Sequence, residues 1–417
     1  MIFTKIREII KKNLIILLIL IVATFLRFYR LEELITFGGD QGIDLLVIKR
    51  MIVEHKWTLL GPKTSVLPIY NGPIYYYMLL PLLYFTKLNP ISVSYFMIFL
   101  WLVAIFLVYY LGKEFWSERA GTLAAFFFSI WPVSVEYSRV SFNSFPTPFF
   151  ASLFLYGLWS FLKKENYLGI ILMGLCSGIM MQLHYFNFFL ILLSLIFLLI
   201  KRKIGWKKLT VFTLAFLVSF SPIVLFELRH QFFNTKNLLI SIKKGRLTNF
   251  EPKLHYFIAF FPVFFIVLGI LFDCLYQKFK VLGLGLIVFL SFFNLYRLDL
   301  HRNHGFTMPQ GWNYIGVKKA SEIIAADAGE NFNVAAILDG DTRAHPYRYL
   351  IETKGKIPMS VEQYPEAKTL YIIAKGDENF VLNYPVWEIY SFLPAKVEKI
   401  WNIQNGISVF KLVKNNN

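Results

Sequence analysis

The sequence contains few of the residues and motifs on which several common kinds of protein depend. Only two cysteines occur in 417 residues, which leaves no disulfide framework as the basis of the fold. Acidic residues are also scarce, 26 against 43 lysines and arginines, giving a net charge of +17. Walker loops, Rossmann glycine patterns, nucleophile elbows and metal-ligand spacings are all missing. The common nucleotide-binding, serine-hydrolase and zinc-site motifs are therefore excluded.

Apolar residues are what the chain has in abundance. Hydrophobic residues make up 56% and aromatic residues 18% of the chain, more than a soluble protein of this length carries. Apolar runs of about 20 residues match the thickness of a bilayer. We therefore predict a polytopic α-helical membrane protein with about nine spans. These spans are predicted at residues 13–29, 91–111, 120–136, 145–162, 167–183, 185–200, 208–226, 254–272 and 281–297.

The segment Pro73–Phe85 is as apolar as the spans but short and interrupted by Pro81. If this segment lies in the interface, the N-terminus and every short basic loop fall on the cytoplasmic side, as the positive-inside rule requires. We therefore predict nine spans plus an interfacial helix, and only the basic external loop 227–253 departs from the rule. The residues predicted to face the cytoplasm are Lys5, Arg7, Lys11, Lys12, Lys113, Arg119, Lys163, Lys164, Lys201, Arg202, Lys203, Lys207, Lys208, Lys278 and Lys280.

This topology also accounts for the cysteines and for the net charge. Cys176 falls within a span and Cys274 in a cytoplasmic loop, so the two cannot pair. Much of the positive charge belongs to cytoplasmic loops and to groups that meet membrane lipids. No nucleic-acid partner is expected. The predicted localisation is a multi-pass protein of the cell membrane with a cytoplasmic N-terminus.

The pattern changes after the last predicted span. Charged residues become frequent, and Trp312–Ala328 has the spacing of a helix. Three short runs read as buried strands: Val334–Leu338, Thr369–Ala374 and Ile407–Val413. We predict a membrane module over residues 1–300 and a C-terminal α/β extracytoplasmic domain over residues 301–417.

Candidate site residues gather in the predicted external segments, and the first of these is the loop 29–90. Asp40 follows a Gly-Gly pair and is predicted as the N-cap of an amphipathic helix on the membrane surface, with Asp44 one turn later on the same face. These carboxylates are either a helix cap and a solvated face or groups that act on a ligand. Tyr75 and Tyr76, in the interfacial segment, either anchor the chain at the headgroups or guide a lipid chain.

Two further external segments hold cationic candidates. Arg139 either snorkels to the headgroups or binds phosphate, and Asn143 either caps the next helix or binds a ligand. Arg229 and His230 stand where the seventh predicted span meets the loop 227–253. In the C-terminal domain, Asp339–Arg343 and His345–Arg348 form a turn between elements or contact an acceptor.

The order of these parts resembles the GT-C type glycosyltransferases, in the branch of protein O-mannosyltransferases and aminoarabinose transferases (glycosyltransferase family 39-like). The resemblance covers residues 13–300. It is carried by three motifs, the acidic Gly39-Asp40-Gln41-Gly42, the Gly-Pro-x-Tyr-Tyr-Tyr segment of residues 72–77 and the turn from Ser138-Arg139 to Pro148.

The resemblance implies transfer of a sugar from a polyprenyl-phosphate donor to an acceptor hydroxyl, on the outer side of the membrane and with inversion. Asp40 takes the position of the family's aspartate base, and Gln41 stands where the family commonly has glutamate. Asn143 lies where some relatives have an aspartate that helps to hold a metal, so no cofactor or metal is expected. The acceptor is a protein, a lipid or a glycan. The residues predicted to bind substrate are Asp44, Gln41, Arg139, Asn143, Tyr75, Tyr76, Arg229 and His230.

Two other functional classes remain open from the sequence. A lipid-linked sugar transporter or flippase also has many spans, but it is expected to carry ionisable or helix-breaking residues near the middle of the membrane. The predicted span interiors are almost free of charge. A non-catalytic envelope assembly protein would explain the outer domain without a role for Asp40.

Overall fold

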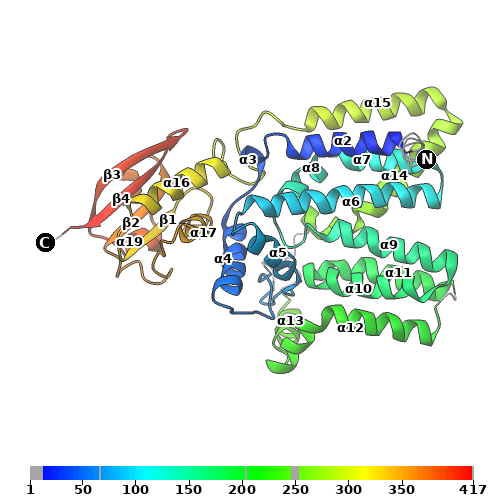
Figure 1. Ribbon diagram of the computed structural model, residues 1–417, viewed down its shortest axis with the longest axis horizontal. Helices are drawn as coiled ribbons and strands as arrows, with labels where there is room; N and C mark the ends of the chain where they lie inside the picture. The colour runs from blue at the N-terminus through cyan, green and yellow to red at the C-terminus, as the bar shows by residue number, and fades with distance from the viewer. Residues whose placement is uncertain (1–12, 65–66, 202–203, 246–252, 416–417) are drawn as a thin grey trace, which may run out of the picture.

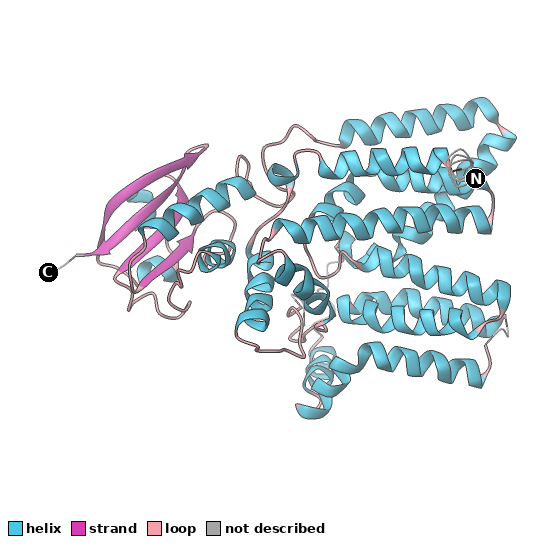
Figure 2. Ribbon diagram, in the orientation of Figure 1, coloured by secondary structure: helices cyan, strands magenta, loops and turns pink. Residues whose placement is uncertain are grey.

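A computed structural model of the protein describes residues 13–64, 67–201, 204–245 and 253–415. It consists of a large helical part, followed by a smaller unit that combines helices with one sheet (Figure 2). Some positions used in the topology prediction lie outside the described residues. They are Lys5, Arg7, Lys11, Lys12, Arg202, Lys203 and residues 246–252 of the predicted external loop.

The helical part extends to Arg297, and most of its helices lie side by side (Figure 1). Its first helices are α2 (Leu14–Phe28), α3 (Leu31–Leu34), α4 (Gly39–Val53), α5 (Ile74–Phe85), α6 (Ile91–Phe115), α7 (Glu118–Ile130), α8 (Pro132–Arg139) and α9 (Thr147–Lys164). The rest are α10 (Tyr167–Leu183), η1 (Tyr185–Asn187), α11 (Phe188–Ile200), α12 (Trp206–Arg229), α13 (Phe233–Lys243), η2 (Leu254–Phe260), α14 (Phe261–Lys278) and α15 (Lys280–Arg297).

Several of these helices are suited to a bilayer. Within the described ranges, four are long and apolar enough, by length and composition, to cross a membrane: Ile91–Phe115, Trp206–Arg229, Leu254–Lys278 and Lys280–Arg297. Shorter apolar helices occupy Leu14–Phe28, Ile74–Phe85, Tyr167–Leu183 and Tyr185–Ile200. The predicted multi-span helical class is confirmed, while the number of nine spans stays a prediction.

One predicted span is divided in two. The run 120–136 contains Pro132, which has no N–H to continue a helix and is favoured in a first turn. Accordingly α7 ends at Ile130, Trp131 adopts an extended backbone, and α8 begins at Pro132. This break lets the chain turn inward at Arg139 before α9 begins.

The connections between the long helices follow the predicted alternation. The α6–α7, α9–α10, α11–α12 and α14–α15 connections lie at the end of the helical part where α2 begins, and the α/β unit lies at the opposite end (Figure 1). The described basic residues of the predicted cytoplasmic loops are in or next to these four connections. They are Lys113, Arg119, Lys163, Lys164, Lys201, Lys207, Lys208, Lys278 and Lys280.

The α/β unit contains a four-stranded sheet with the strand order β1-β2-β4-β3. β1 pairs with β2 in parallel, and the other two pairings are antiparallel. Three strands were predicted, but β3 was missed because its charged and mostly solvent-facing residues hide the apolar alternation of an edge strand. The elements are α16 (Tyr314–Asp327), β1 (Phe332–Ala336), α17 (His345–Thr353), β2 (Thr369–Lys375), α18 (Glu378–Leu382), α19 (Trp387–Tyr390), β3 (Ala395–Gln404) and β4 (Ile407–Lys414).

The α/β unit shares one of its two hydrophobic cores with the helical part. Buried residues of α16 and α17 belong to the same apolar cluster as residues of α4 and α5. The ring of Phe37 meets Tyr314 edge to face, with centroids 5.5 Å apart, and Lys49 pairs with Glu352 at 2.6 Å. Consequently α4 packs against both α5 and α17, and its predicted position along the membrane surface stays a prediction.

Candidate active site

The candidate site begins at the N-terminus of α4, whose cap lies two residues earlier than predicted. The cap is Gly38 and not Asp40, because the Gln41 side chain accepts a hydrogen bond from the Gly38 N–H at 3.0 Å and fixes the start of the helix there. Asp40 is therefore a first-turn residue. A carboxylate in that position interacts favourably with the positive end of the helix dipole.

The two carboxylates of α4 differ in their surroundings. Asp44 is 5% exposed and accepts a hydrogen bond from the Tyr76 hydroxyl at 2.8 Å. Burial, reinforced by the charge of Asp40, raises the pKa of Asp44 to about 8 even though the Tyr76 bond opposes this shift. The Asp40 side chain is exposed, and no described residue gives its carboxylate a hydrogen bond or an ion pair. Its pKa is also raised, first by partial desolvation and then by Asp341.

A turn between α8 and α9 is fixed beside these carboxylates. Gln41 Nε2 donates to the Ser141 carbonyl oxygen at 3.0 Å, and the Tyr75 hydroxyl lies 2.5 Å from the Ser141 hydroxyl. Asn143 Nδ2 donates to the Leu183 carbonyl oxygen at 2.7 Å. Gln41 and Tyr75 are buried and hold this turn in place, and they are not among the described residues that line the adjoining cavity.

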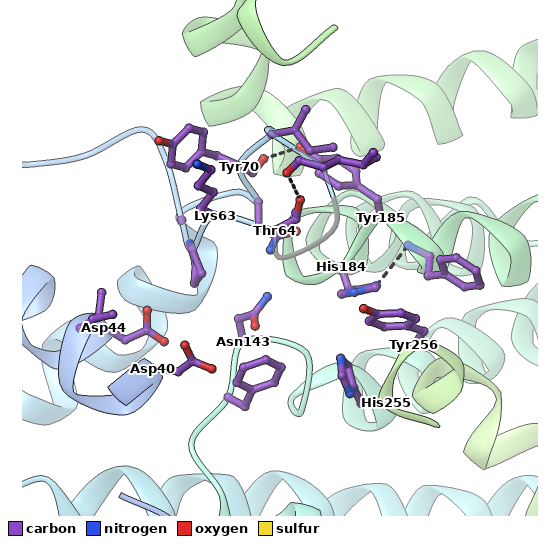
Figure 3. Close-up of a pocket in the computed structure, with 18 of the residues that line it drawn as sticks. Asp40, Asp44, Lys63, Thr64, Tyr70, Asn143, His184, Tyr185, His255 and Tyr256 are labelled. Carbon is purple, nitrogen blue, oxygen red and sulfur yellow. Dashed lines mark hydrogen bonds between the residues drawn. The ribbon is translucent and has the colours of Figure 1, made fainter. Parts of the chain in front are cut away.

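Asp40, Asp44 and Asn143 open onto a cavity of about 740 Å³ (Figure 3). Tyr76 also reaches it, so four of the nine predicted site residues meet at one place. The floor and walls come from α4, the loop 61–71, the turn before α9, the α10–η1 junction and the start of η2. Further lining residues are Ile43, Val47, Gly61, Pro62, Lys63, Thr64, Leu67, Ile69, Tyr70, Asn71, Phe142, His184, Tyr185, Phe186, Lys253, His255 and Tyr256.

Aromatic and histidine side chains form the wall that faces the carboxylates. His184 stacks on Tyr256 with ring centroids 4.8 Å apart, and His255 meets Tyr256 edge to face at 4.5 Å. Burial, followed by the nearby His255, lowers the pKa of His184 to about 4. His184 is therefore neutral at pH 7, and this wall offers flat, uncharged rings to a ligand.

The loop 61–71 closes another side of the cavity and is tied to α13. Lys63 and Tyr70 pair as an antiparallel bridge. Asn234, at the start of α13, accepts from the Tyr70 N–H at 2.9 Å, and the Tyr185 hydroxyl donates to the Tyr70 carbonyl oxygen at 2.7 Å. This wall is thus held from two helices.

Three predicted cationic residues lie elsewhere. Arg139 is fully buried, where Nε donates to the Arg27 carbonyl oxygen at 3.2 Å and Nη2 to that of Leu26. Arg229 is exposed at the end of α12, and His230 stacks on Phe226 with centroids 4.3 Å apart. None of the three is among the described residues that line the cavity.

Sequence analysis did not single out the cationic side chains that do line the cavity, Lys63 and Lys253. Lys253 is close enough to Asp40 to lower the pKa of that carboxyl, against the larger effect of burial. Each lysine stands in an irregular external loop with no motif around it. The only indication of a role was their position in loops predicted to lie outside the cytoplasm, and other lysines share that position. Among the described residues, no group of three or more His, Cys, Asp or Glu could hold a metal ion.

The chain is similar to known proteins in part of its sequence and in its fold. The family model described as dolichyl-phosphate-mannose-protein mannosyltransferase matches residues 71–226. No match is found among curated protein sequences. The crystal structure of ArnT from Cupriavidus metallidurans in the apo state covers 95% of this chain and 97% of ArnT, with a TM-score of 0.62 and 11% sequence identity.

This chain has the ArnT fold. The structure of the same ArnT bound to undecaprenyl phosphate covers 96% of this chain and 98% of ArnT, with a TM-score of 0.60 and 11% identity. The predicted resemblance to GT-C type glycosyltransferases is confirmed. The oligosaccharyltransferase AglB from Archaeoglobus fulgidus shows 14% identity over 82% of this chain and 47% of AglB, with a TM-score of 0.40.

The ArnT fold extends over both parts of the chain. Its alignment includes the C-terminal sheet unit as well as the helices, since nearly all of each chain is covered. The predicted fold class, a GT-C-like helical membrane protein with a C-terminal α/β unit, is thereby confirmed. In this ArnT-like chain, the candidate cavity is built by the helical part close to the α/β unit.

Proposed function

We propose that this chain transfers a sugar from a polyprenyl-phosphate donor to an acceptor hydroxyl, with Asp40 as the base. The observation that carries the proposal is the free, exposed carboxylate of Asp40 at a cavity that two lysines also line. The similarity to ArnT, which has been crystallised with undecaprenyl phosphate, supports the donor class. The acceptor is a protein, a lipid or a glycan.

Asp40 is a better candidate for the base than Asp44. With a pKa of about 8, Asp44 is mostly protonated at pH 7 and cannot accept a proton. Asp40 is exposed, and partial burial followed by Asp341 raises its pKa, which makes it a stronger base. A buried, protonated carboxyl beside an exposed one commonly divides the roles of a site. In this site, Asp44 is a protonated neighbour of Asp40 and is bonded to Tyr76.

The reaction needs only a base and cations. The acceptor oxygen forms a bond to the anomeric carbon while the bond from that carbon to the phosphate oxygen breaks, and its electron pair stays on the phosphate. The acceptor proton moves to Asp40. Because the leaving phosphate is already a stable anion, no general acid is required, and Lys63 and Lys253 are placed to stabilise its charge. Direct attack inverts the anomeric configuration, and the scheme needs no bound metal.

The cavity also suits the two ends of such a donor. Apolar and aromatic side chains such as Leu67, Phe142 and Phe186 stand beside the polar groups, and rings of this kind stack on sugar faces or contact the first isoprene units. The positions of the basic residues around the α6–α7, α9–α10, α11–α12 and α14–α15 connections support a cytoplasmic N-terminus. The cavity and the α/β unit then lie on the outer side of the membrane.

The test uses purified protein in lipid with a panel of radiolabelled polyprenyl-phosphate sugars and crude envelope acceptor. We expect transfer by the wild type and a loss of about 10²–10⁴-fold in kcat in Asp40→Asn, the usual contribution of a general base. EDTA should leave the rate unchanged, and the product should carry the inverted configuration. Equal transfer by Asp40→Asn would remove this residue from the mechanism. No donor consumption with any sugar would favour a transporter or an assembly protein.

A further inference from the structure

The α/β unit reaches the candidate site through the segment 339–346, which packs against the first turn of α4. A Cβ atom on Gly39 would lie 2.8 Å from the Asp341 Cβ, and one on Gly42 would lie 2.3 Å from the Pro346 backbone nitrogen. Real Cβ atoms do not approach other atoms so closely. Both glycines are therefore required for this contact, and the neighbour of Gly39 in the chain is Asp40.

Asp341 is held in this position by His345. The His345 ring Nδ1 lies 2.8 Å from Asp341 Oδ1, and the His345 backbone N–H donates to Oδ2, also at 2.8 Å. The Asp341 side chain is 15% exposed and the His345 side chain is 18% exposed. Both carboxylate oxygens of Asp341 thus have a partner. The Asp341–His345 pair packs against the turn that carries Asp40.

The charged groups around Asp40 come from three parts of the chain. Asp341 raises the pKa of Asp40, in addition to the larger effect of partial burial, while Lys253 and His345 lower it. Asp44, on the same helix, interacts with Asp40 electrostatically as well. The α/β unit therefore contributes two groups, Asp341 and His345, whose effects on the pKa of Asp40 oppose each other, and the loop before η2 contributes Lys253.

We propose that Asp341 and His345 are positioning residues for Asp40, through which the α/β unit fixes the turn that bears this carboxylate and sets the charge around it. The inference deepens the proposed function, since it takes Asp40 as the base. It also gives the contact between the two units a role in the chemistry. Neither residue is among those that line the cavity, so both act through Asp40.

The test is an infrared titration of the Asp40 carboxyl in lipid, identified as the band that Asp40→Asn removes. In Asp341→Asn, which keeps a side-chain acceptor for the His345 N–H, the Asp40 midpoint should fall by about 0.5–1 pH unit. In His345→Gln the midpoint should rise by a similar amount, because Asp341 loses its partner. The acidic limb of the pH profile of kcat/KM should move in the same two directions.

The control is Asp377→Asn, which alters a carboxylate that caps α18 through the Phe380 N–H at 2.8 Å. It should leave the midpoint unchanged. Shifts of opposite sign in the two variants support the inference even in protein that shows no transfer, so the titration separates it from the proposed function. Unchanged midpoints, or equal shifts of the same sign in both variants, would reduce the pair to a purely structural role and overturn the inference.

Discussion

Two groups of charged residues in this protein differ in how their side chains are held. One is the arginine cluster, which we define as Arg27, Arg139, Glu136 and Arg302. The other is the carboxylate pair Asp40 and Asp44. In the arginine cluster, Glu136 pairs with Arg302 and lies 3.6 Å from Arg139. In the carboxylate pair, Asp40 has no such partner among the described residues.

Helix termini explain why the arginine cluster is buried. Arg27 Nη1 donates at 2.9 Å to the carbonyl oxygen of Ser129 in the last turn of α7, and Arg139 donates to carbonyls at the end of α2. A helix C-terminus carries partial negative charge and free carbonyl groups, both of which favour a cation. These arginines therefore join α2, α7 and α8, whereas Asp40 keeps its carboxylate available to the cavity. Of the two groups, only the carboxylate pair is therefore open to a ligand in the cavity.

The largest expected effect comes from breaking the arginine cluster. Arg139→Met should lower the free energy of unfolding by about 3–5 kcal/mol, because it leaves the buried carbonyl groups of Leu26 and Arg27 without their donor and removes the positive charge beside Glu136. In the protein that still folds, KM for the lipid-linked donor should stay within about twofold, since the side chain is remote from the cavity. Thermal unfolding and donor kinetics measure the two quantities.

Arg229→Gln is the matched control for Arg139→Met, because it removes an exposed arginine at another span end. It should change neither stability nor KM. A tenfold rise in KM with unaltered stability in Arg139→Met would instead return Arg139 to the phosphate-binding role that the sequence suggested.

How far the sequence predicts this structure depends on whether a feature is local. Apolar runs predicted the helices, and the Gly-Gly-Asp motif located the carboxylate that opens onto the cavity. Short apolar runs predicted β1, β2 and β4. The break at Trp131 was also readable from Pro132, although the length of the apolar run concealed it.

Features that depend on packing were not predicted. No motif around Gly42 indicates that Pro346, some 300 positions later, packs against α4. Lys63 faces the cavity only because the loop 61–71 folds back on itself and is tied to Asn234. Arg139 was assigned to phosphate because its carbonyl partners come from α2, more than 100 residues away. Each of these misses is a contact between distant segments.

Lys63 and Lys253, which line the cavity together with the carboxylate pair, give the next prediction. Lys253→Gln and Lys63→Gln should each lower kcat/KM by about 10–100-fold, corresponding to about 1.5–3 kcal/mol for a hydrogen bond to a charged group. Kinetics with the lipid-linked donor measure this. Lys243→Gln, a change in α13 outside the cavity lining, is the control and should have no effect. If Lys253→Gln and Lys63→Gln behave like this control, the phosphate lies elsewhere.

The smallest expected effect concerns Asp44. Its folded pKa of about 8 exceeds the ordinary value of 3.8, so the folded protein holds a proton that the unfolded chain releases. Stability from this group is therefore fully present below about pH 4 and is lost as pH rises toward 8. Asp44→Asn can still accept from Tyr76 but does not titrate. Relative to wild type, it should gain on the order of 2 kcal/mol between pH 6 and pH 8, measured by thermal unfolding.

Asp327 provides the control of opposite sign for this experiment. Despite the opposing effect of burial, its bonds to Tyr371 and Lys411 lower the pKa of Asp327, so its titration lies below pH 4. The difference in stability between Asp327→Asn and wild type should stay constant from pH 5 to pH 8. A constant difference for Asp44→Asn as well would mean that Asp44 is ionised in the folded protein. Asp40 would then face a second negative charge, and the division of roles between the two carboxylates would have to be abandoned.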